Sequence, residues 1–315
     1  MIRSIDRAYL RDALDSIALQ TYPNIEVVVV AAKPGHGRLA DRCGPFPLRL
    51  VDTDAPLPRS RAANRALDEA QGQYLIFLDD DDWLMPGHIA RLAQVMQFQP
   101  KALVAYTGVS LVTESGEPLG QSMDSPFDAI LQQAGNFIPI HAVLFSRLLL
   151  DRGARFDEEL NHYEDWDFWL QLARHTAFVH LPGVSAVYRM HESSGVHNDA
   201  GPLGAATGKI YDKWQPLWPA SRQRALLERV WSAQNLEAAL RDSQAATAEQ
   251  WALRSRQDET LAQQAATIHE QAASIARLGA ELAGRDARIA DLVGSTSWRI
   301  TAPLRWLSAK LKRKT

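Results

Sequence analysis

The order of apolar and polar positions divides the first 80 residues into alternating helical and extended segments. Residues 10–17 carry apolar side chains at helical spacing, and residues 25–31 form an apolar run interrupted only by Glu26. An uninterrupted apolar run is typical of a strand buried on both faces, as in a parallel sheet. Another helix is expected at residues 60–70, followed by a buried strand at residues 74–78. This order predicts a doubly wound α/β sheet, which binds ligands beyond the carboxyl ends of its strands.

The composition changes along the chain. Helical and strand patterns alternate up to about residue 200, whereas Gly and Pro become rare after residue 221 and Ala, Gln, Glu and Arg dominate. The sequence therefore predicts an α/β domain at residues 1–200, a linker at 201–220, a helical or coiled-coil segment at 221–294 and a basic amphipathic tail at 295–315.

Composition and charge narrow the class of protein. The 315 residues carry a net charge of -3 and 46% hydrophobic residues, which is typical of a globular protein. A single cysteine, Cys43, excludes an internal disulfide framework and a cysteine-rich zinc site. Neither a run of 18 uncharged apolar residues nor a signal-peptide core is present, so we expect a cytoplasmic protein whose body does not span a membrane.

Four consecutive aspartates, Asp79 to Asp82, follow the strand predicted at residues 74–78. Neighbouring carboxylates disfavour each other's ionised form, and a divalent cation relieves that repulsion. Because side chains alternate in an extended segment, Asp79 and Asp81 are expected to point to one side and Asp80 to the other. Mg²⁺ combines such carboxylates with substrate phosphates, so the pair is a candidate site for a metal diphosphate. The alternative is a solvated acidic turn before the helix expected from residue 87.

Two further polar groups lie in the second half of the α/β domain. Asp165 falls in the first turn of a predicted helix with an apolar face, where its carboxylate can face a cleft. The alternative is that acidic residues here only complement the positive end of that helix. Farther on, Arg189 and His191 follow a predicted strand, which makes them candidates for binding a phosphate and a metal. A lone loop histidine is more often a solvated side chain, so His191 gains weight only in combination with the aspartates.

In their order and spacing, these motifs resemble the inverting family 2 glycosyltransferases, which have the GT-A fold. The resemblance covers residues 1 to about 200 and implies a Rossmann-like, mostly parallel sheet. The matching segments are 13–17, 20–26, Arg61-Ala62-Ala63-Asn64, 72–82, 156–158, 164–167 and Tyr188-Arg189-Met190-His191.

The resemblance also implies a mechanism. Asp79, Asp81 and His191 would hold Mg²⁺ or Mn²⁺, which neutralises charge on the departing nucleotide diphosphate of a nucleotide diphosphosugar. Asp165 would accept the proton of an acceptor hydroxyl as the oxygen attacks the anomeric carbon, inverting its configuration in one displacement. The remaining implied contacts are Arg3, Ser4, Arg61, Asn64, Asp80 and Arg189 for the donor, and His141, Glu164 and Trp166 for the acceptor.

The sequence departs from the family pattern in two places. Most of the first strand is missing, so we expect a shortened domain in which Arg3 and Ser4 are remnants of the nucleotide loop. After the strand at residues 27–30, Ala31 and Ala32 occupy positions where the family often has an acidic residue for the nucleotide. The usual base contact therefore does not carry over, although Lys33 and the glycine-rich turn after it remain able to meet phosphate or base.

The segment 221–294 is interpreted from its heptad pattern. Apolar residues recur every seven positions, and the second apolar position of the heptad is often polar or charged. A weak coiled coil that pairs copies of the chain is the leading interpretation, and a single amphipathic helix lying on the α/β domain is the alternative. The recurring residues are Leu261, Ile268, Ile275, Leu282 and Ile289, with Leu278 and Leu292 in the second position.

Basic and apolar residues alternate in the tail. Residues 299–315 contain six basic residues and no acidic one, and Leu304, Leu307 and Leu311 share one face of a helix that Pro303 can start. A basic amphipathic helix with tryptophan suits an anionic membrane interface. We therefore expect peripheral contact with the inner face of the cell membrane, in preference to nucleic acid.

Two function classes follow from the sequence. The first is an active glycosyltransferase that extends a surface polysaccharide, an O-antigen or a lipid-linked oligosaccharide. The second is a non-catalytic, transferase-like scaffold at the membrane, which the shortened first strand favours. Metal-dependent nucleotide binding separates the two.

Overall fold

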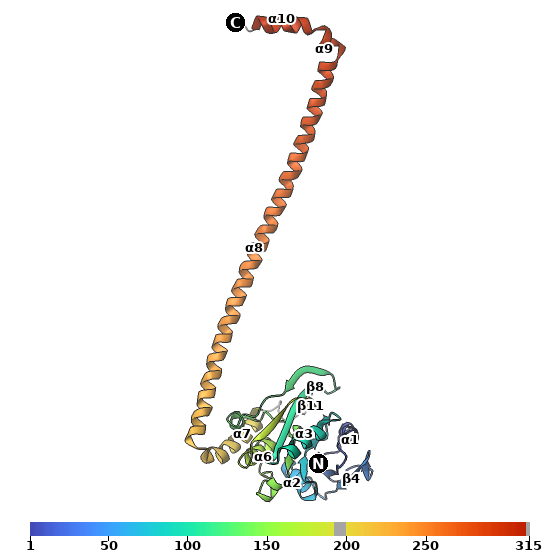
Figure 1. Ribbon diagram of the computed structural model, residues 1–315, viewed down its shortest axis with the longest axis vertical. Coiled ribbons are helices and arrows are strands. Elements are labelled where there is room, and N and C mark those ends of the chain that lie inside the picture. Colours follow the sequence, from blue (N-terminus) through green and yellow to red (C-terminus); the bar gives the residue numbers. More distant parts are fainter. Residues whose placement is uncertain (192–199, 313–315) are drawn as a thin grey trace. The chain divides into compact units, whose positions relative to one another are not determined.

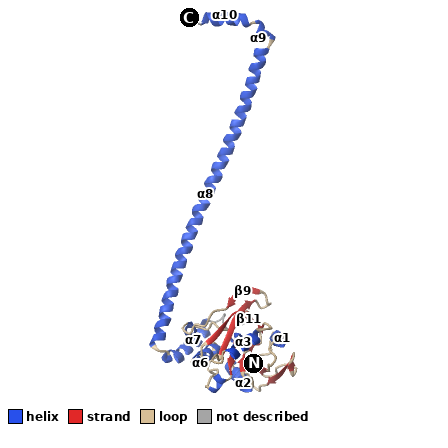
Figure 2. Ribbon diagram, viewed as in Figure 1, coloured by secondary structure: helices blue, strands red, loops and turns tan. Residues whose placement is uncertain are grey.

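The computed structural model describes residues 1–191 and 200–312 (Figure 1). The chain divides into two compact units, Met1–Val230 and Trp231–Thr315. Strands occur in the first unit, and the described part of the second is helical throughout (Figure 2).

The first sheet of the N-terminal unit has the strand order β3-β4-β2-β1-β6. Strands β1, β2, β4 and β6 run parallel, and β1 pairs with β2 on one side and β6 on the other. β1, with three residues, therefore lies between the five-residue β2 and the two-residue β6. The strands are β1 Ile2–Ser4, β2 Val27–Ala31, β3 Arg42–Cys43, β4 Phe46–Val51 and β6 Leu78–Asp79.

The second sheet is mixed, with the order β5-β10-β8-β11-β7 and β9 paired to β8. Only β8 and β11 run parallel in it, so the prediction of a mostly parallel sheet holds for the first sheet alone. The reason is local, since β8 turns directly back into β9 without a crossover helix. The strands are β5 Tyr74–Ile76, β7 Trp83–Leu84, β8 Val104–Val112, β9 Pro118–Met123, β10 Val143–Ser146 and β11 Phe178–Arg189.

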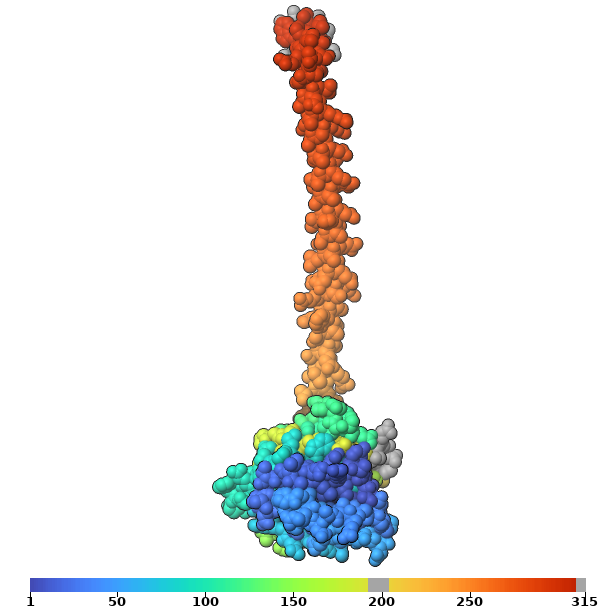
Figure 3. Space-filling model, turned by 90° about the vertical axis from the view of Figure 1, so that its right-hand side faces the viewer, coloured from blue at the N-terminus to red at the C-terminus, as the bar shows by residue number. Residues whose placement is uncertain are grey.

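Helices cover the sheets and bury their apolar stripes in a common core. The helices expected near residues 10–17, 60–70 and 87–98 are all present, and α6 begins where the second acidic motif predicted a helix. The helices are α1 Leu10–Ala18, α2 Arg59–Glu69, α3 His88–Phe98, α4 Leu131–Ala134, η1 Ile140–Ala142, α5 Leu148–Asp151 and α6 Glu164–Ala173. In the space-filling view, the blue N-terminal segments form one continuous face of this unit (Figure 3).

The structure differs from the sequence prediction at residues 201–220, which were expected to be a linker. Residues Ala200–Trp214 form α7, followed by the short helix η2, Gln215–Leu217. Ile210, Trp214 and Trp218 are buried against Trp166 and other apolar residues. Ile210 and Trp214 share one face of α7, since they are four residues apart, and Trp218 follows η2. Their burial explains why the segment packs against the domain instead of remaining solvated.

The C-terminal unit consists of α8 Ala220–Gly294, which starts in the first unit, α9 Thr296–Ile300 and α10 Ala302–Lys312. Along its 75 described residues α8 buries no side chain, and the heptad residues Leu261, Ile268 and Ile275 are 61–70% exposed. Within the described parts of the chain, every helix is too short or too polar to cross a bilayer. The coiled coil stays a prediction.

Candidate active site

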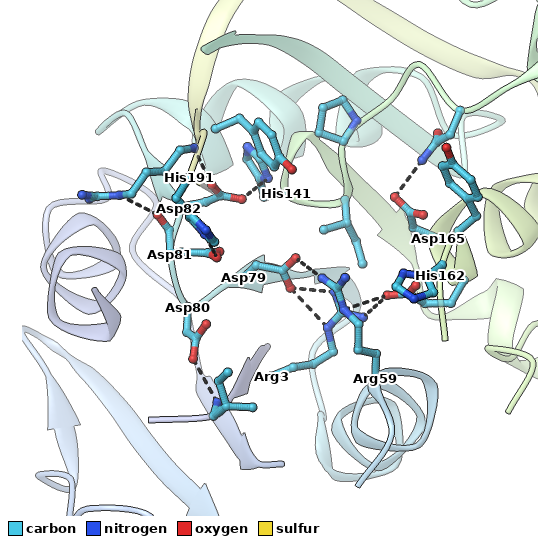
Figure 4. Close-up of a pocket in the computed structure, with 18 of the residues that line it drawn as sticks. Arg3, Arg59, Asp79, Asp80, Asp81, Asp82, His141, His162, Asp165 and His191 are labelled. Atoms are coloured by element: carbon cyan, nitrogen blue, oxygen red, sulfur yellow. Dashed lines mark hydrogen bonds and ion pairs between the residues drawn. The ribbon is translucent and has the colours of Figure 1, made fainter. Parts of the chain in front are cut away.

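A cavity of about 540 Å³ opens at the carboxyl ends of β1 and β6, where a doubly wound sheet places its ligands. Figure 4 shows the four aspartates on one side of it and Asp165 on the other. The cavity therefore joins the two acidic motifs that lie more than 80 residues apart in the sequence.

Asp79 lies between two arginines. Arg3 Nη2 is 2.6 Å from Asp79 Oδ1, and Arg59 Nη2 is 3.2 Å from Asp79 Oδ2. Burial raises the pKa of the Asp79 carboxyl, but Arg3 and Arg59 outweigh it and hold that pKa well below its usual range. Asp79 is ionised throughout the neutral range as a result. The sequence did not identify Arg59 as a site residue. Its partner Glu164 is distant in the chain, and the two residues come together only in the folded protein.

Asp81 provides the best evidence for a cation site. Burial, followed by the carboxylates of Asp82 and Asp79, raises the pKa of Asp81. His191 Nε2 lies 2.9 Å from Asp81 Oδ2, and the Arg7 guanidinium contacts the same oxygen. Carboxylate oxygens of Asp79, Asp81 and Asp82 lie within 4.8 Å of one another. An oxygen-rich set of three carboxylates fits a hard divalent ion, with His191 within reach.

Asp80 points to the end of β1, away from Asp79. Its Oδ2 accepts hydrogen bonds from Ser4 Oγ and Ile5 N, both at 3.0 Å. Ser4 Oγ also lies 3.0 Å from His36 Nε2. Ser4 and Asp80, both predicted to bind the donor, thus fix the β1 loop to the aspartate loop.

His141 does not lie beside Asp165, where an acceptor residue was expected. It is fully buried, with Nδ1 3.0 Å from Asp82 Oδ2 and its ring stacked on Tyr188. Burial lowers the pKa of His141, but the Asp82 carboxylate more than offsets this and the pKa is raised. His141 belongs to η1, which places its ring against Asp82. We therefore infer that His141 orients Asp82.

Arg189 lines the cavity, but its side chain is held by contacts within the protein. Its guanidinium lies between the rings of Tyr9 and Trp83, and Nη2 is 2.6 Å from Asp12 Oδ2. It also donates to the backbone oxygens of Asp81 and Glu114, while its own N–H donates to Asp82 Oδ1. Arg189 therefore stabilises the segment of residues 79–82, because its donors already face acceptors within the protein.

Asp165 stands in the first turn of α6, as its position in the motif predicted. Asn136 Nδ2 donates a hydrogen bond of 2.7 Å to Asp165 Oδ2, and Trp166 N donates to Oδ1. Burial and the neighbouring Glu164 raise the pKa of Asp165 to about 7. A carboxylate with this pKa can accept and release a proton near neutral pH.

The two neighbours of Asp165 have separate roles. Glu164 is buried and pairs with Arg3 at 2.6 Å. Because Arg3 also pairs with Asp79, its guanidinium joins Asp79 to the residue next to Asp165. Trp166, expected on the acceptor side, is only 2% exposed and donates its indole N–H to Gln132 O. Tyr163, which lines the cavity, has a left-handed backbone with φ of 56°. Tyr163 therefore presents an aromatic ring to the cavity close to Asp165 in the sequence.

Arg61 and Asn64 do not line the cavity. Arg61 Nε pairs with Glu158 Oε2 at 3.0 Å, and Asn64 exchanges two hydrogen bonds of 2.9 Å with the backbone of Phe156. Their motif therefore holds the 156–158 segment against α2. Arg59, at the start of the same helix, reaches the cavity instead.

Comparisons with known proteins agree with this architecture. Residues 5–150 match the model of the family described as Glycosyl transferase family 2. The chain is 24% identical over 214 residues to the uncharacterized glycosyltransferase YwdF of Bacillus subtilis, covering 65% of this chain and 77% of the relative. It is 26% identical over 231 residues to the uncharacterized glycosyltransferase RT0329 of Rickettsia typhi, covering 67% and 66%.

Among solved structures, residues 1–349 of S. aureus TarS in complex with UDP-GlcNAc give a TM-score of 0.49 at 18% identity, covering 61% of this chain and 58% of that one. The mannosyltransferase PcManGT of Pyrobaculum calidifontis, in complex with GDP-Man and Mn2+, gives 0.45 at 17% identity, covering 78% and 79%.

The family match therefore falls on the α/β unit that contains the cavity. More specifically, the match to Glycosyl transferase family 2 over residues 5–150 confirms the family resemblance predicted from the motifs.

Proposed function

We propose that this protein is a metal-dependent, inverting glycosyltransferase that moves a sugar from a nucleotide diphosphosugar to an acceptor hydroxyl. The observation that carries the proposal is the shared cavity, in which the aspartate cluster and Asp165 face one another. One side can bind a charged diphosphate and the other can remove a proton.

The metal side consists of Asp81 and His191, with Asp79 as the further carboxylate. Mg²⁺ or Mn²⁺ suits these ligands, and when bound it would stabilise negative charge on the departing nucleotide diphosphate. Arg3 and Arg59 hold Asp79 ionised, so that it remains a ligand at any neutral pH.

The acceptor side works through Asp165. Its ionised carboxylate takes the proton of the acceptor hydroxyl, and Asn136 keeps the accepting oxygen in place. Because the base faces the donor site across the cavity, attack comes from the face opposite the leaving group and the anomeric configuration inverts.

The acceptor we propose is a growing glycan or a lipid-linked saccharide of a surface polysaccharide, O-antigen or oligosaccharide. The reaction would take place at the cytoplasmic face of the membrane, with copies of the chain paired through α8. The exposed heptad residues support the pairing, and the basic tail supports the location.

One observation favours the alternative of a non-catalytic scaffold. Each aspartate of the cluster already has a cationic or imidazole partner within the protein: Arg3 and Arg59 for Asp79, Arg7 for Asp80 and Asp81, and His141 for Asp82. In a scaffold these pairs would persist, whereas in an enzyme the metal must displace Arg7 from Asp81.

The two possibilities are separated by thermal unfolding with nucleotide diphosphosugars, with and without Mn²⁺. A bound ligand raises the unfolding free energy by RT ln(1 + [L]/Kd). An enzyme gives a stabilisation that requires both donor and metal, and loses it in Asp81→Asn but not in Asp151→Asn, which changes an exposed aspartate of α5. Equal stability in all conditions would overturn the proposal.

A further inference from the structure

The chain ends in a folded corner rather than in a simple continuation of α8. Ser295 separates α8 from α9, and α10 follows after Thr301. We call residues 295–309 the elbow. It lies within the C-terminal unit.

Two side chains, those of Ser295 and Arg305, stabilise the elbow. Ser295 Oγ accepts a hydrogen bond from Trp298 N and caps α9. The Arg305 guanidinium stacks 3.6 Å from the centre of the Trp298 ring and donates to Trp298 O and Thr301 Oγ1, both at 2.5 Å. Arg305 thus joins the end of α9 to the start of α10, so the angle between these two helices is specified by side chains.

The elbow exposes large apolar side chains in a short stretch. Ile300, Leu304 and Leu307 are 73%, 69% and 53% exposed, and Trp298 is 42% exposed. Leu304 and Leu307 lie on one face of α10, three residues apart. Such clustering of apolar surface marks a binding site, whereas scattered exposed apolar residues are ordinary.

The charge around these side chains has a single sign. The sequence contains no acidic residue after Asp291, and it contains six basic ones from Arg299 onward. Cationic charge beside exposed tryptophan and leucine complements a surface that is anionic at its boundary and apolar beneath it. A nucleic acid offers the anionic part but has no apolar layer for Leu304 and Leu307.

We propose that the elbow binds the interface of an anionic phospholipid bilayer. Leu304, Leu307 and Ile300 enter the boundary between headgroups and acyl chains, and Arg299 contacts lipid phosphates. Arg305 keeps α9 and α10 at the angle at which both reach the surface. The binding is peripheral, and it is independent of the glycosyl transfer proposed above.

The test is co-sedimentation of the full chain with phosphatidylcholine vesicles, with and without phosphatidylserine. Wild-type protein binds only the anionic vesicles and dissociates as salt is raised. Arg299→Gln lowers the partition coefficient about fivefold, which is the share of one basic residue near anionic lipid. Arg277→Gln, the same change on α8, leaves it unaltered.

Two further variants separate insertion and geometry from charge. Leu304→Ser with Leu307→Ser lowers binding by about tenfold or more at unchanged net charge. Arg305→Lys keeps the charge but loses the planar stack on Trp298, and it binds less tightly than wild type. Circular dichroism checks that the helical content of each variant is unchanged.

Either of two results would overturn the proposal: equal affinity for neutral and anionic vesicles, or tighter binding to duplex DNA than to anionic vesicles at the same salt. Donor turnover measured without vesicles is unaffected by the elbow variants. A failure of membrane binding is therefore distinguishable from a failure of the catalytic proposal.

Discussion

Asp165 and Asp79 carry opposite pKa shifts although Arg3 lies near both. Arg3 and Arg59 contact Asp79 directly and hold its pKa low, whereas burial and the neighbouring Glu164 raise the pKa of Asp165 to about 7. One carboxylate is therefore ionised at neutral pH, as the proposed metal ligand must be, and the other can exchange a proton there, as the proposed base must. Two acids acquire two roles from their surroundings.

The raised pKa of Asp165 predicts the pH dependence of the reaction. A base acts only when ionised, so below its pKa of about 7 the rate falls with falling pH, and above it the rate levels off. The measurement is kcat/KM against pH for wild type and Asn136→Ala. Loss of the Asn136 hydrogen bond to the ionised form moves the midpoint to higher pH. A midpoint near pH 4 in wild type would be incompatible with this environment.

The sequence could indicate the titratable residues of the site but not all of their partners. Asp79, Asp81 and Asp165 stand out because their motifs are local. Arg59 and Asn136 were not predicted, because each belongs to the site only through a contact with a residue distant in the sequence, Glu164 for Arg59 and Asp165 for Asn136. Trp166, Arg189 and His141 illustrate the reverse case. Their residue types fit ligand binding, and Arg189 and His141 line the cavity, but the burial of all three side chains and their partners within the protein favour a positioning role.

At the scale of elements, α7 supports the helix that carries the proposed base. Asp167 on α6 is fully buried and accepts from Trp214 Nε1 at 2.7 Å and from Lys213 Nζ. Tyr211 Oη donates to Ala134 O, so α7 also contacts the end of α4. The helix was expected to be a linker, because few cues mark its amphipathic face.

Asp167→Asn tests that support. The variant removes the buried carboxylate with which Lys213 pairs. We expect a loss of about 1.5–3 kcal/mol in the free energy of unfolding by urea. The matched change Asp157→Asn removes the other, more exposed partner of Lys213 and costs less than about 1 kcal/mol. Equal losses would show that α7 is not anchored at Asp167.

Helix α8 is the element whose stability is least explained by its own contacts. Long helices in water depend on packing of an apolar face, and α8 buries none of its described residues. A two-stranded coiled coil supplies that packing. Sedimentation of the full chain should show a dimer that Ile268→Glu weakens, whereas Ala266→Glu, on the outward side of the heptad, leaves it intact. A monomeric wild type would refute the pairing.

For the whole molecule, periodicity predicted the α/β class and the first sheet, since buried parallel strands and amphipathic helices leave clear patterns. It did not predict the antiparallel partners of β10, because pairing between distant strands leaves no local signal. The family 2 match and the cavity both lie in the N-terminal unit, and the C-terminal helices add proposed roles in pairing and membrane contact.

The central claim is that the aspartate cluster binds the metal and donor while Asp165 acts as the base. It is tested most directly by comparing Asp81→Asn and Asp165→Asn with the same donor. Donor binding is followed by titration with and without Mn²⁺, and sugar transfer by product formation. We expect Asp81→Asn to lose metal-dependent donor affinity by about tenfold or more. Asp165→Asn should retain donor binding and lose about 10² to 10⁴ in turnover. Unchanged turnover in Asp165→Asn, or donor binding that ignores both Mn²⁺ and Asp81, would contradict the account.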